Sequence, residues 1–147
     1  MKLKDYPSLA EFISQHPVAT IAVPVDNNGT IHAASLLYAN NTEPLEFYFV
    51  TARDSEKYTL LKTTNSIPCA VVIGTEKETP FTLQMRGKLG EIDPLEHEGQ
   101  VKAYYEKRGN HNDDINNPYT CLLRFTPTWA RFTDYSKGYE RYFLDIQ

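Results

Sequence analysis

A polar stretch at the junction between a strand and a helix contains the residues best suited to bind an anion. Phe47 to Val50 is apolar and typical of a strand, and hydroxyl and cationic side chains follow it: Thr51, Arg53, Ser55 and Lys57. Amide groups and the helix dipole at a helix start favour a bound phosphate, and Ser, Thr, Arg and Lys can complete its hydrogen bonds. The stretch is therefore a candidate phosphate site.

The same residues have a purely structural interpretation. Asp54 or Ser55 can cap the helix, while Arg53 and Lys57 form surface ion pairs with Asp54 and Glu56. Taken by itself, the local sequence favours this second interpretation.

A second group of polar side chains follows one side of a predicted strand, Phe81 to Ile92. Thr82, Gln84, Arg86 and Lys88 alternate with apolar residues, so they point to the same side of that strand. They could line a ligand cleft or face water, and facing water is the commoner arrangement.

Other kinds of catalytic site find little support. The four histidines show no metal-ligand spacing, and Cys69 and Cys121 lack the nearby partners that a zinc site needs. The chain has no G-x-S-x-G elbow, no glycine motif of the Walker or Rossmann type, and no recognisable Cys and His couple. We expect no metal site, and the hydrolase and nucleotide triphosphatase classes are disfavoured.

Short strands are the main elements that must position these side chains. Val18 to Val25 and Thr30 to Tyr38 flank a hairpin turn, and the polar segment Asn40 to Pro44 is expected to be a loop. Further strands are expected at Leu45 to Val50, Ile67 to Gly74, Phe81 to Ile92, Tyr119 to Phe125, Trp129 to Thr133 and Tyr139 to Ile146. Six or more short strands with hairpin turns predict a barrel or sandwich.

Three short helices complete the prediction. Leu9, Phe12 and Ile13 form the apolar stripe of the first, and the second begins near Tyr58. The third begins with Pro94 in its first turn and ends at Gly109.

The length and net charge of the chain limit the classes of protein to which it can belong. A chain of 147 residues predicts a single domain, residues 1–147. The net charge of −4 disfavours a nucleic-acid partner, and no window is apolar enough to span a membrane. Met1 to Asp5 is charged, unlike a signal peptide, and both cysteines lie in apolar runs where a reduced thiol is expected. A cytoplasmic location is therefore expected.

Several segments, taken in order, resemble the pyridoxamine 5′-phosphate oxidase-like, FMN-binding split-barrel superfamily. They are Val18 to Val23, His32 to Ser35, Phe47 to Lys57, Gln84 to Gly90, Tyr104 to Arg108 and Phe132 to Asp134. The resemblance extends from about Pro17 to Leu144 and depends on the order and spacing of the segments. The tail is most similar to that of small uncharacterised bacterial members.

The resemblance implies a mainly β fold, a six-stranded antiparallel split barrel that forms a homodimer with two FMN molecules at the subunit interface. It places Thr51, Ser55 and Lys57 where the family binds the FMN phosphate, and so favours the phosphate interpretation. It also places Ser35, Leu36 and Leu37 on the strand that borders the isoalloxazine ring. Gln84, or Thr82 on the same strand face, takes the place of a flavin-contacting glutamine.

Three departures from the oxidase bear on mechanism. Glu56 replaces a second phosphate-binding base, Tyr38 replaces a substrate lysine, and Thr133 replaces a flavin-contacting tryptophan. Pyridoxamine phosphate is therefore not the expected substrate. Arg53 and Arg86 could supply the missing positive charge, since a partly desolvated phosphate needs compensation.

Three hypotheses follow. The first is an FMN-dependent oxidoreductase with a small-molecule substrate, in which the flavin carries the redox chemistry. The second is a non-catalytic module that stores or senses flavin, haem or another aromatic ligand. The third is a structural barrel dimer without a cofactor.

Overall fold

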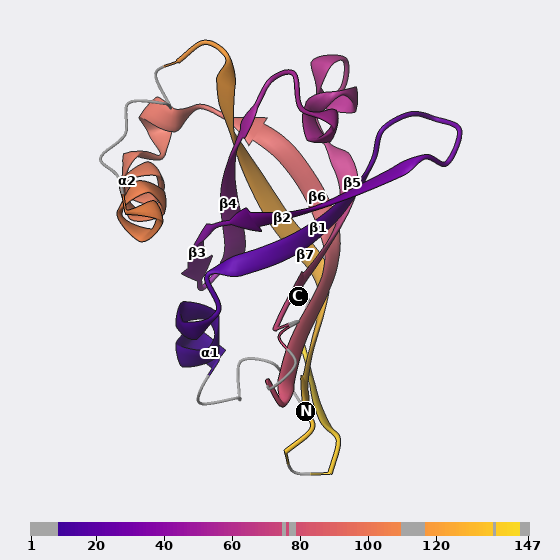
Figure 1. The fold of residues 1–147 in the computed structure, drawn as a ribbon, viewed down its shortest axis with the longest axis vertical. Coiled ribbons are helices and arrows are strands. Elements are labelled where there is room, and N and C mark those ends of the chain that lie inside the picture. The colour runs from indigo at the N-terminus through magenta and orange to yellow at the C-terminus, as the bar shows by residue number, and fades with distance from the viewer. Residues whose placement is uncertain (1–8, 75, 77–78, 110–116, 137, 145–147) are drawn as a thin grey trace.

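One antiparallel sheet dominates the computed structural model, which describes residues 9–74, 76, 79–109, 117–136 and 138–144 (Figure 1). Its strands are β1 (Val18–Pro24), β2 (Ile31–Leu37), β3 (Ala39–Thr42), β4 (Leu45–Ala52), β5 (Ile67–Ile73), β6 (Phe81–Ile92), β7 (Thr120–Asp134) and β8 (Glu140–Phe143). Seven strands follow the order β2-β1-β5-β6-β7-β4-β3, and β8 pairs with β7 outside this path. The fold is therefore mainly β, as the sequence predicts.

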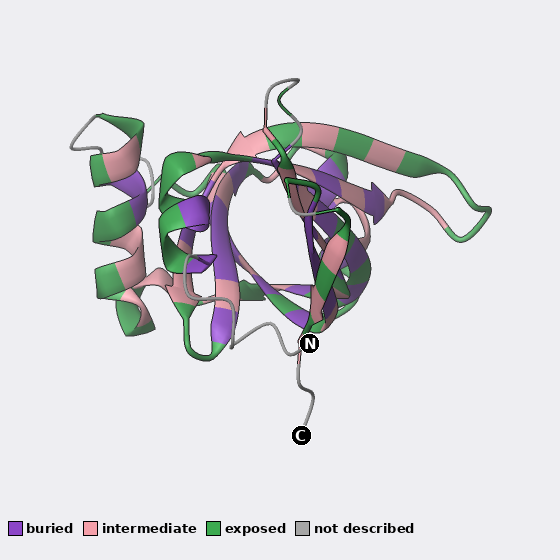
Figure 2. Cartoon of the chain, turned by 90° about the horizontal axis from the view of Figure 1, so that it is seen from below, coloured by how far each residue is buried: buried purple, intermediate pink, exposed green. Residues whose placement is uncertain are grey.

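Alternating side chains give the sheet an apolar inner face. β1 buries Ala19, Ile21 and Val23, and β5 buries every second residue from Ile67 to Ile73. Because successive side chains of a strand point to opposite faces, these buried residues all lie on one face of the sheet. The sheet curls so that this face encloses the main core. Figure 2 shows the buried residues lining the inside of the curled sheet, with α2 outside it.

Tyr38 forms the corner between the two ends of the sheet. β2 and β3 are the two ends of the strand path, and Tyr38 is the single residue between them in sequence. It is fully buried, and its ring packs against Phe47 and Phe49, with centroids 5.4 and 6.4 Å away. Its hydroxyl donates to the main-chain oxygen of Ile13, at 2.9 Å, and to that of His16. The corner is thus tied to the first helix and to β4.

Two α-helices cover different parts of the sheet. α1 (Leu9–Gln15) buries Leu9, Phe12 and Ile13 in the main core. α2 (Glu98–Arg108) packs Tyr104 and Tyr105 into a second cluster with Tyr48 and Leu122 on the outer face, and ends at Gly109 in a left-handed conformation (φ 83°). Lys107 near its end lies 3.9 Å from the Tyr38 ring centroid, and burial lowers the pKa of this ammonium group.

The sheet has eight strands where the resemblance implies six, and two parts of it differ from the strands that the sequence predicts. The expected loop at Asn40 to Pro44 contains most of β3, because polar residues there pair with β4 from Thr42 opposite Leu45. The expected strands Tyr119 to Phe125 and Trp129 to Thr133 form one strand, β7, while the short β8 lies within the expected final segment, Tyr139 to Ile146.

A β-bulge makes the continuous β7 compatible with Pro127. The register between β6 and β7 shifts at Arg86 and Gly87, where Gly87 lies opposite Pro127. A Cβ atom on Gly87 would lie 2.1 Å from the Thr126 main-chain oxygen, so only glycine fits there. Proline is tolerated in strands at such irregularities because the ladder hydrogen bond is already interrupted.

The expected second helix is replaced by two 3-10 turns, η2 (Glu56–Tyr58) and η3 (Leu60–Lys62). Thr63 and Thr64 donate side-chain hydrogen bonds to the Leu60 oxygen, at 3.3 and 3.0 Å. These bonds occupy a carbonyl group that a continuing helix would use. The expected third helix consists of a 3-10 turn, η4 (Pro94–Glu96), followed by α2.

No helix within the described ranges has both the length and the apolar character needed to cross a membrane. Met1 to Asp5 lies outside the described residues, as do Asp145 and Ile146 at the end of the expected tail strand.

Replacing Tyr38 with Phe should lower the free energy of unfolding by about 1–3 kcal/mol, because buried main-chain oxygens lose their hydroxyl donor. Chemical denaturation of both proteins measures the change. Tyr119→Phe is the control, since Tyr119 is 76% exposed and should lose less than about 0.5 kcal/mol. Equal stability of Tyr38→Phe and the natural protein would contradict the role of the corner.

Candidate anion-binding site

The turn after β4 presents three of the predicted phosphate-binding residues. Ser55 caps η2, and its Oγ accepts a hydrogen bond from the Lys57 main-chain nitrogen at 3.3 Å. The cap expected from the structural interpretation is therefore present. Ser55 can still donate a hydrogen bond to a ligand, because a hydroxyl that accepts one hydrogen bond keeps its own proton.

Lys57 is a buried cation without an acidic partner in the described part of the chain. Its exposed fraction is only 9%, and none of the ion pairs among the described residues includes it. Glu56, its expected partner, lies with Oε2 2.9 Å from Nδ1 of His32 on β2. A buried charge is costly unless it is paired and hydrogen-bonded, so the geometry at Lys57 suits an anion.

Cys121 is paired with Thr51 and lies close enough to Lys57 to feel its charge. Thr51 is buried on the inner face of β4 and pairs in register with Cys121, whose thiol donates to the Thr51 main-chain oxygen at 3.6 Å. Burial raises the pKa of the Cys121 thiol to about 12, and the positive charges of Arg53 and Lys57 act in the opposite direction. Cys121 is thus a protonated, buried thiol and not a nucleophile at neutral pH.

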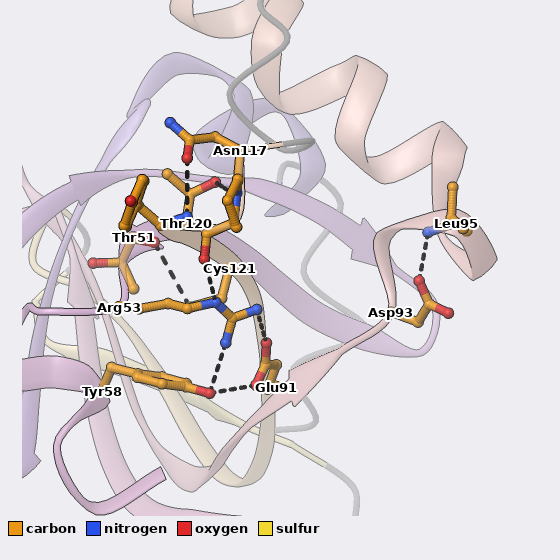
Figure 3. A network of polar contacts seen from close by, with 11 residues as sticks. Thr51, Arg53, Tyr58, Glu91, Asp93, Leu95, Asn117, Thr120 and Cys121 are labelled. Carbon is orange, nitrogen blue, oxygen red and sulfur yellow. Dashed lines mark hydrogen bonds and ion pairs between the residues drawn. The ribbon is translucent and has the colours of Figure 1, made fainter. Parts of the chain in front are cut away.

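Arg53 belongs to a separate network that its own neighbours satisfy (Figure 3). Its Nη2 lies 2.7 Å from Oε2 of Glu91, and its Nη1 donates to the Tyr58 hydroxyl at 2.8 Å. Tyr58 in turn donates to Oε1 of Glu91 at 2.6 Å, and the Arg53 Nε donates to the Pro118 oxygen at 3.1 Å. Arg53 therefore links the turn after β4 to β6 and to the segment before β7.

The side chains of this network shift one another's pKa values. Partial burial raises the pKa of Glu91, but hydrogen bonds from Arg53 and Tyr58 outweigh it, so the net shift is downward. The hydrogen bond to Glu91 raises the pKa of Tyr58 and is also the main reason that the pKa of Arg53 rises. The carboxylate, the phenol and the guanidinium thus stabilise one another.

An open pocket of about 560 Å³ adjoins the network and is lined by Arg53, Thr64, Asn65, Glu91 and Asp93 among others. Arg53 and Glu91 already pair with each other, and Asp93 caps η4 by accepting from the Leu95 nitrogen at 2.9 Å. The pocket lining offers no unpaired cation, so the phosphate candidate remains at Lys57.

The strand predicted to border a flavin ring presents its residues to different faces. Ser35 is exposed on the outer face, with Oγ 3.2 Å from Oγ1 of Thr20. Leu36 packs against the main core, while Leu37 packs against the outer cluster beside α2. Of the three, Ser35 alone presents its side chain on the open outer face of the sheet.

Thr82, Gln84 and Arg86 lie on that same outer face of β6, as the alternation predicts. Gln84 accepts through Oε1 from Nη2 of Arg131, and Arg86 lies over the Trp129 ring, 4.0 Å from its centroid. Thr82 is opposite Thr133, the residue that replaces a family tryptophan.

Within one chain the predicted residues form two separate groups. Thr51 pairs with Cys121 on β7 and Gln84 pairs with Arg131, ten positions further along the same strand. At about 3.3 Å per residue these positions are separated by roughly 30 Å of strand. The turn with Lys57 and the face with Gln84 and Arg86 therefore do not meet in a single chain.

The described residues contain no group of three or more His, Cys, Asp or Glu side chains able to hold a metal ion.

No protein-family model matches the chain, and no curated protein matches its sequence. Solved structures do match its fold. A protein from Clostridium acetobutylicum, related to general stress protein 26 of B. subtilis and of the pyridoxinephosphate oxidase family, is 15% identical with a TM-score of 0.64. The match covers 93% of this chain and 91% of that one.

A candidate pyridoxamine 5′-phosphate oxidase from Listeria innocua is 16% identical with a TM-score of 0.65, and the match covers 85% of this chain and 94% of that one. This chain has the pyridoxamine 5′-phosphate oxidase-like split-barrel fold. A haem-binding protein from Mycobacterium smegmatis shares the split barrel at 12% identity and a TM-score of 0.68, over 88% of this chain and 54% of that one. The resemblance seen in the sequence is confirmed at the level of the fold.

The Glu91 network should affect stability in acid. The lowered pKa means that Glu91 stabilises the fold at pH values above 4.5, its ordinary pKa, and that this contribution disappears as the pH falls through the lower folded value. Glu91→Gln should therefore be less stable than the natural protein at neutral pH, and the difference should shrink in acid. Denaturation midpoints measured across the acidic range test this expectation.

Glu96→Gln is the matched control, because Glu96 is exposed and forms no ion pair with the described residues. Its denaturation midpoints should follow those of the natural protein across the same range. A constant difference between Glu91→Gln and the natural protein at every pH would contradict the assigned charge interaction.

Proposed function

We propose that two copies of this chain bind FMN between them and act as an FMN-dependent oxidoreductase on a small molecule. The observation that carries the proposal is Lys57, a cation with 9% exposure and no carboxylate partner in the described part of the chain. The split-barrel neighbours named for pyridoxamine or pyridoxine phosphate oxidase support the choice of flavin.

The phosphate group would be held by Lys57 together with the hydroxyls of Ser55 and Thr51. A phosphate accepts charge-assisted hydrogen bonds from an ammonium group, and these are stronger than bonds between neutral groups. Both hydroxyls can donate as well, since Ser55 uses only its acceptor in capping and Thr51 forms no side-chain hydrogen bond with the described residues. Arg53 is not needed, because Glu91, Tyr58 and Pro118 already occupy it.

Glu56 is compatible with a neighbouring phosphate because of its partner. Its carboxylate pairs with His32 of β2, so its negative charge is directed toward the strand. This contact also joins the phosphate turn to the strand that carries Ser35. The replacement of a phosphate-binding base by Glu56 therefore leaves Lys57 as the main cation of the site.

A homodimer would bring the two separate groups together. Gln84 and Ser35 belong to one row on the outer face, joined in register through Thr20 and Val72. Three strand spacings separate them, about 14 Å, which is comparable to the length of a flat ring system with its side chain. We assign the turn with Lys57 to one copy and the outer face with Gln84 to the other.

The bound flavin would supply the electron-transfer chemistry, and the chain would supply binding and orientation. Ser35 and Gln84, both on the open outer face, are the groups available to orient the ring. The scheme requires no acidic or basic side chain at the reacting atoms. It is consistent with the two cysteines, whose thiols are buried and whose pKa values are raised to about 12 by burial.

A non-catalytic haem-binding module is the second candidate, favoured by the similarity to the haem-binding protein from Mycobacterium smegmatis. The two candidates differ in the anionic group that Lys57 would bind, because haem carries carboxylates and no phosphate. Visible absorption spectra after addition of FMN or of haemin separate them.

Lys57→Met should weaken FMN binding about ten- to hundredfold, since a charge-assisted hydrogen bond contributes about 1.5–3 kcal/mol. Methionine keeps the buried aliphatic stem, so the fold should tolerate the change. Fluorescence titration with FMN measures the affinity, and melting of the apo-protein reports the fold.

Two controls make this titration specific. Riboflavin lacks the phosphate, so its weaker binding should be the same in Lys57→Met and in the natural protein. Lys62→Met removes an exposed ammonium group from η3 and should leave FMN affinity unchanged. Equal FMN affinity of Lys57→Met and the natural protein would remove the phosphate assignment, and haemin binding in its place would favour the second candidate.

The protein should be a dimer at micromolar concentration, with the strand from Ser35 to Tyr38 and the C-terminal segment at the interface. Because each copy contributes to both sites, FMN should strengthen dimerisation and raise the melting temperature. Analytical ultracentrifugation with and without FMN measures the dimerisation, and thermal melting with and without FMN measures the stabilisation. A monomer that binds FMN at full strength would exclude the shared site.

A further inference from the structure

Three arginines gather on the outer face where β6, β7 and β8 meet. The register pairs Arg86 with Trp129, Gln84 with Arg131, Arg131 with Phe143, and Thr133 with Arg141. Side chains of paired residues point to the same side of a sheet, and diagonal neighbours lie about 7–8 Å apart. We call this surface the arginine face and define it as Gln84, Arg86, Trp129, Arg131, Arg141 and Phe143.

None of the ion pairs among the described residues includes these three arginines, although acidic residues outnumber basic ones by 19 to 15. Their contacts are with neutral groups instead. Arg86 lies 4.0 Å and Arg131 5.5 Å from the Trp129 ring centroid. Arg141 lies 4.4 Å from the Tyr139 ring centroid and donates to the Tyr139 hydroxyl at 2.6 Å.

Arg131 has an unused donor. Its Nη2 donates to Gln84, but its Nε is buried and forms no hydrogen bond within the described part of the chain. A buried donor without an acceptor is unfavourable, and clustered positive charges repel one another. An anionic ligand on the outer face would relieve the repulsion.

Aromatic rings beside the arginines indicate a second property of the ligand, a flat ring. Trp129 and Phe143 lie 6.5 Å apart between centroids, and Phe143 is 39% exposed. Tyr139 is 50% exposed and has a positive φ of 79°, an unfavourable conformation for a bulky residue. A flat ring can pack against such surfaces while guanidinium groups bind its phosphate or carboxylate in a forked geometry.

We propose that the arginine face binds the substrate of the flavin site, a phosphorylated aromatic small molecule of the nucleotide class. This step rests on the function proposed above, because Gln84 at the centre of the face is the residue assigned to the flavin ring. The phosphate lies on Arg131 and Arg141, and the ring lies against Trp129. Arg86 is then a substrate-side residue, and the FMN phosphate depends on Lys57.

Trp129 is the single tryptophan of the chain, so its fluorescence reports on this face alone. The probe is ADP, with adenosine as the uncharged counterpart. ADP should change the fluorescence to saturation and bind at least tenfold more tightly than adenosine. Arg131→Gln and Arg141→Gln should each weaken ADP binding about tenfold, the loss expected for one charge-assisted hydrogen bond.

Arg124→Gln is the matched control, because Arg124 also belongs to β7 but pairs with Glu46 at 3.4 Å. It should leave ADP binding unchanged. The proposal is overturned if ADP gives no saturable change, if adenosine binds equally well, or if the arginine variants bind ADP like the natural protein.

FMN titrations of the same variants separate this proposal from the function on which it rests. FMN affinity should fall much less in Arg131→Gln and Arg141→Gln than in Lys57→Met, because the arginines do not bind the flavin phosphate. ADP binding through the arginines without any FMN binding would support the face and contradict the flavin function. FMN binding through Lys57 without ADP binding would overturn the present proposal alone.

Two further outcomes also overturn it. Arginine variants that lose FMN as strongly as ADP would place the face in the flavin phosphate site. Arg131→Gln, which lies outside the C-terminal segment, should stay a dimer in the ultracentrifuge, and a monomer would assign the face to the contact between copies instead.

Discussion

The fold depends on the burial of one tyrosine at the corner between β2 and β3. These strands are the two ends of the sheet, yet a single residue separates them along the chain. A sheet whose first and last strands are so connected must curl, and Tyr38 fills the corner with a large ring while its hydroxyl binds the end of α1. Hydrophobic packing and hydrogen bonding thus act together at this corner.

The placement of charge explains how the same fold can hold a ligand. Arg53 is neutralised by Glu91 and serves to fix the turn, whereas Lys57, two positions after the capping turn begins, has no acid of its own among the described residues. The arginines of the outer face are likewise surrounded by amide and aromatic groups. The chain therefore separates cations that build the structure from cations that are available to anions.

Local patterns predicted most of the sheet because β-branched and alternating residues carry that information directly. They failed where tertiary contacts decide the outcome. Asn40 and Asn41 are polar and read as a loop, but pairing with Phe47 and Glu46 makes them part of β3. Two strands were expected on either side of Pro127, but the small Gly87 opposite it lets the backbones approach and the strand continue.

The residues of the candidate site that are close in sequence could also be predicted, whereas their distant partners could not. Thr51, Ser55 and Lys57 are close in sequence, so the spacing alone brought them together. Nothing local to Arg53 indicates Glu91, which is 38 positions away and becomes its partner through the sheet. The pairing of Arg131 with Gln84 was also missed, although continuing the alternation of β7 through Trp129 would have placed Arg131 on the same face.

The two native cysteines have a practical consequence. Both side chains are buried, and burial raises both thiol pKa values to about 12, so few thiolates are present under ordinary buffer conditions. A cysteine introduced at an exposed position would therefore react with maleimide dyes or spin labels while Cys69 and Cys121 stay unmodified. The distance between the turn and the outer face, and the proposed association of two copies, become accessible to spectroscopy without first removing any native residue.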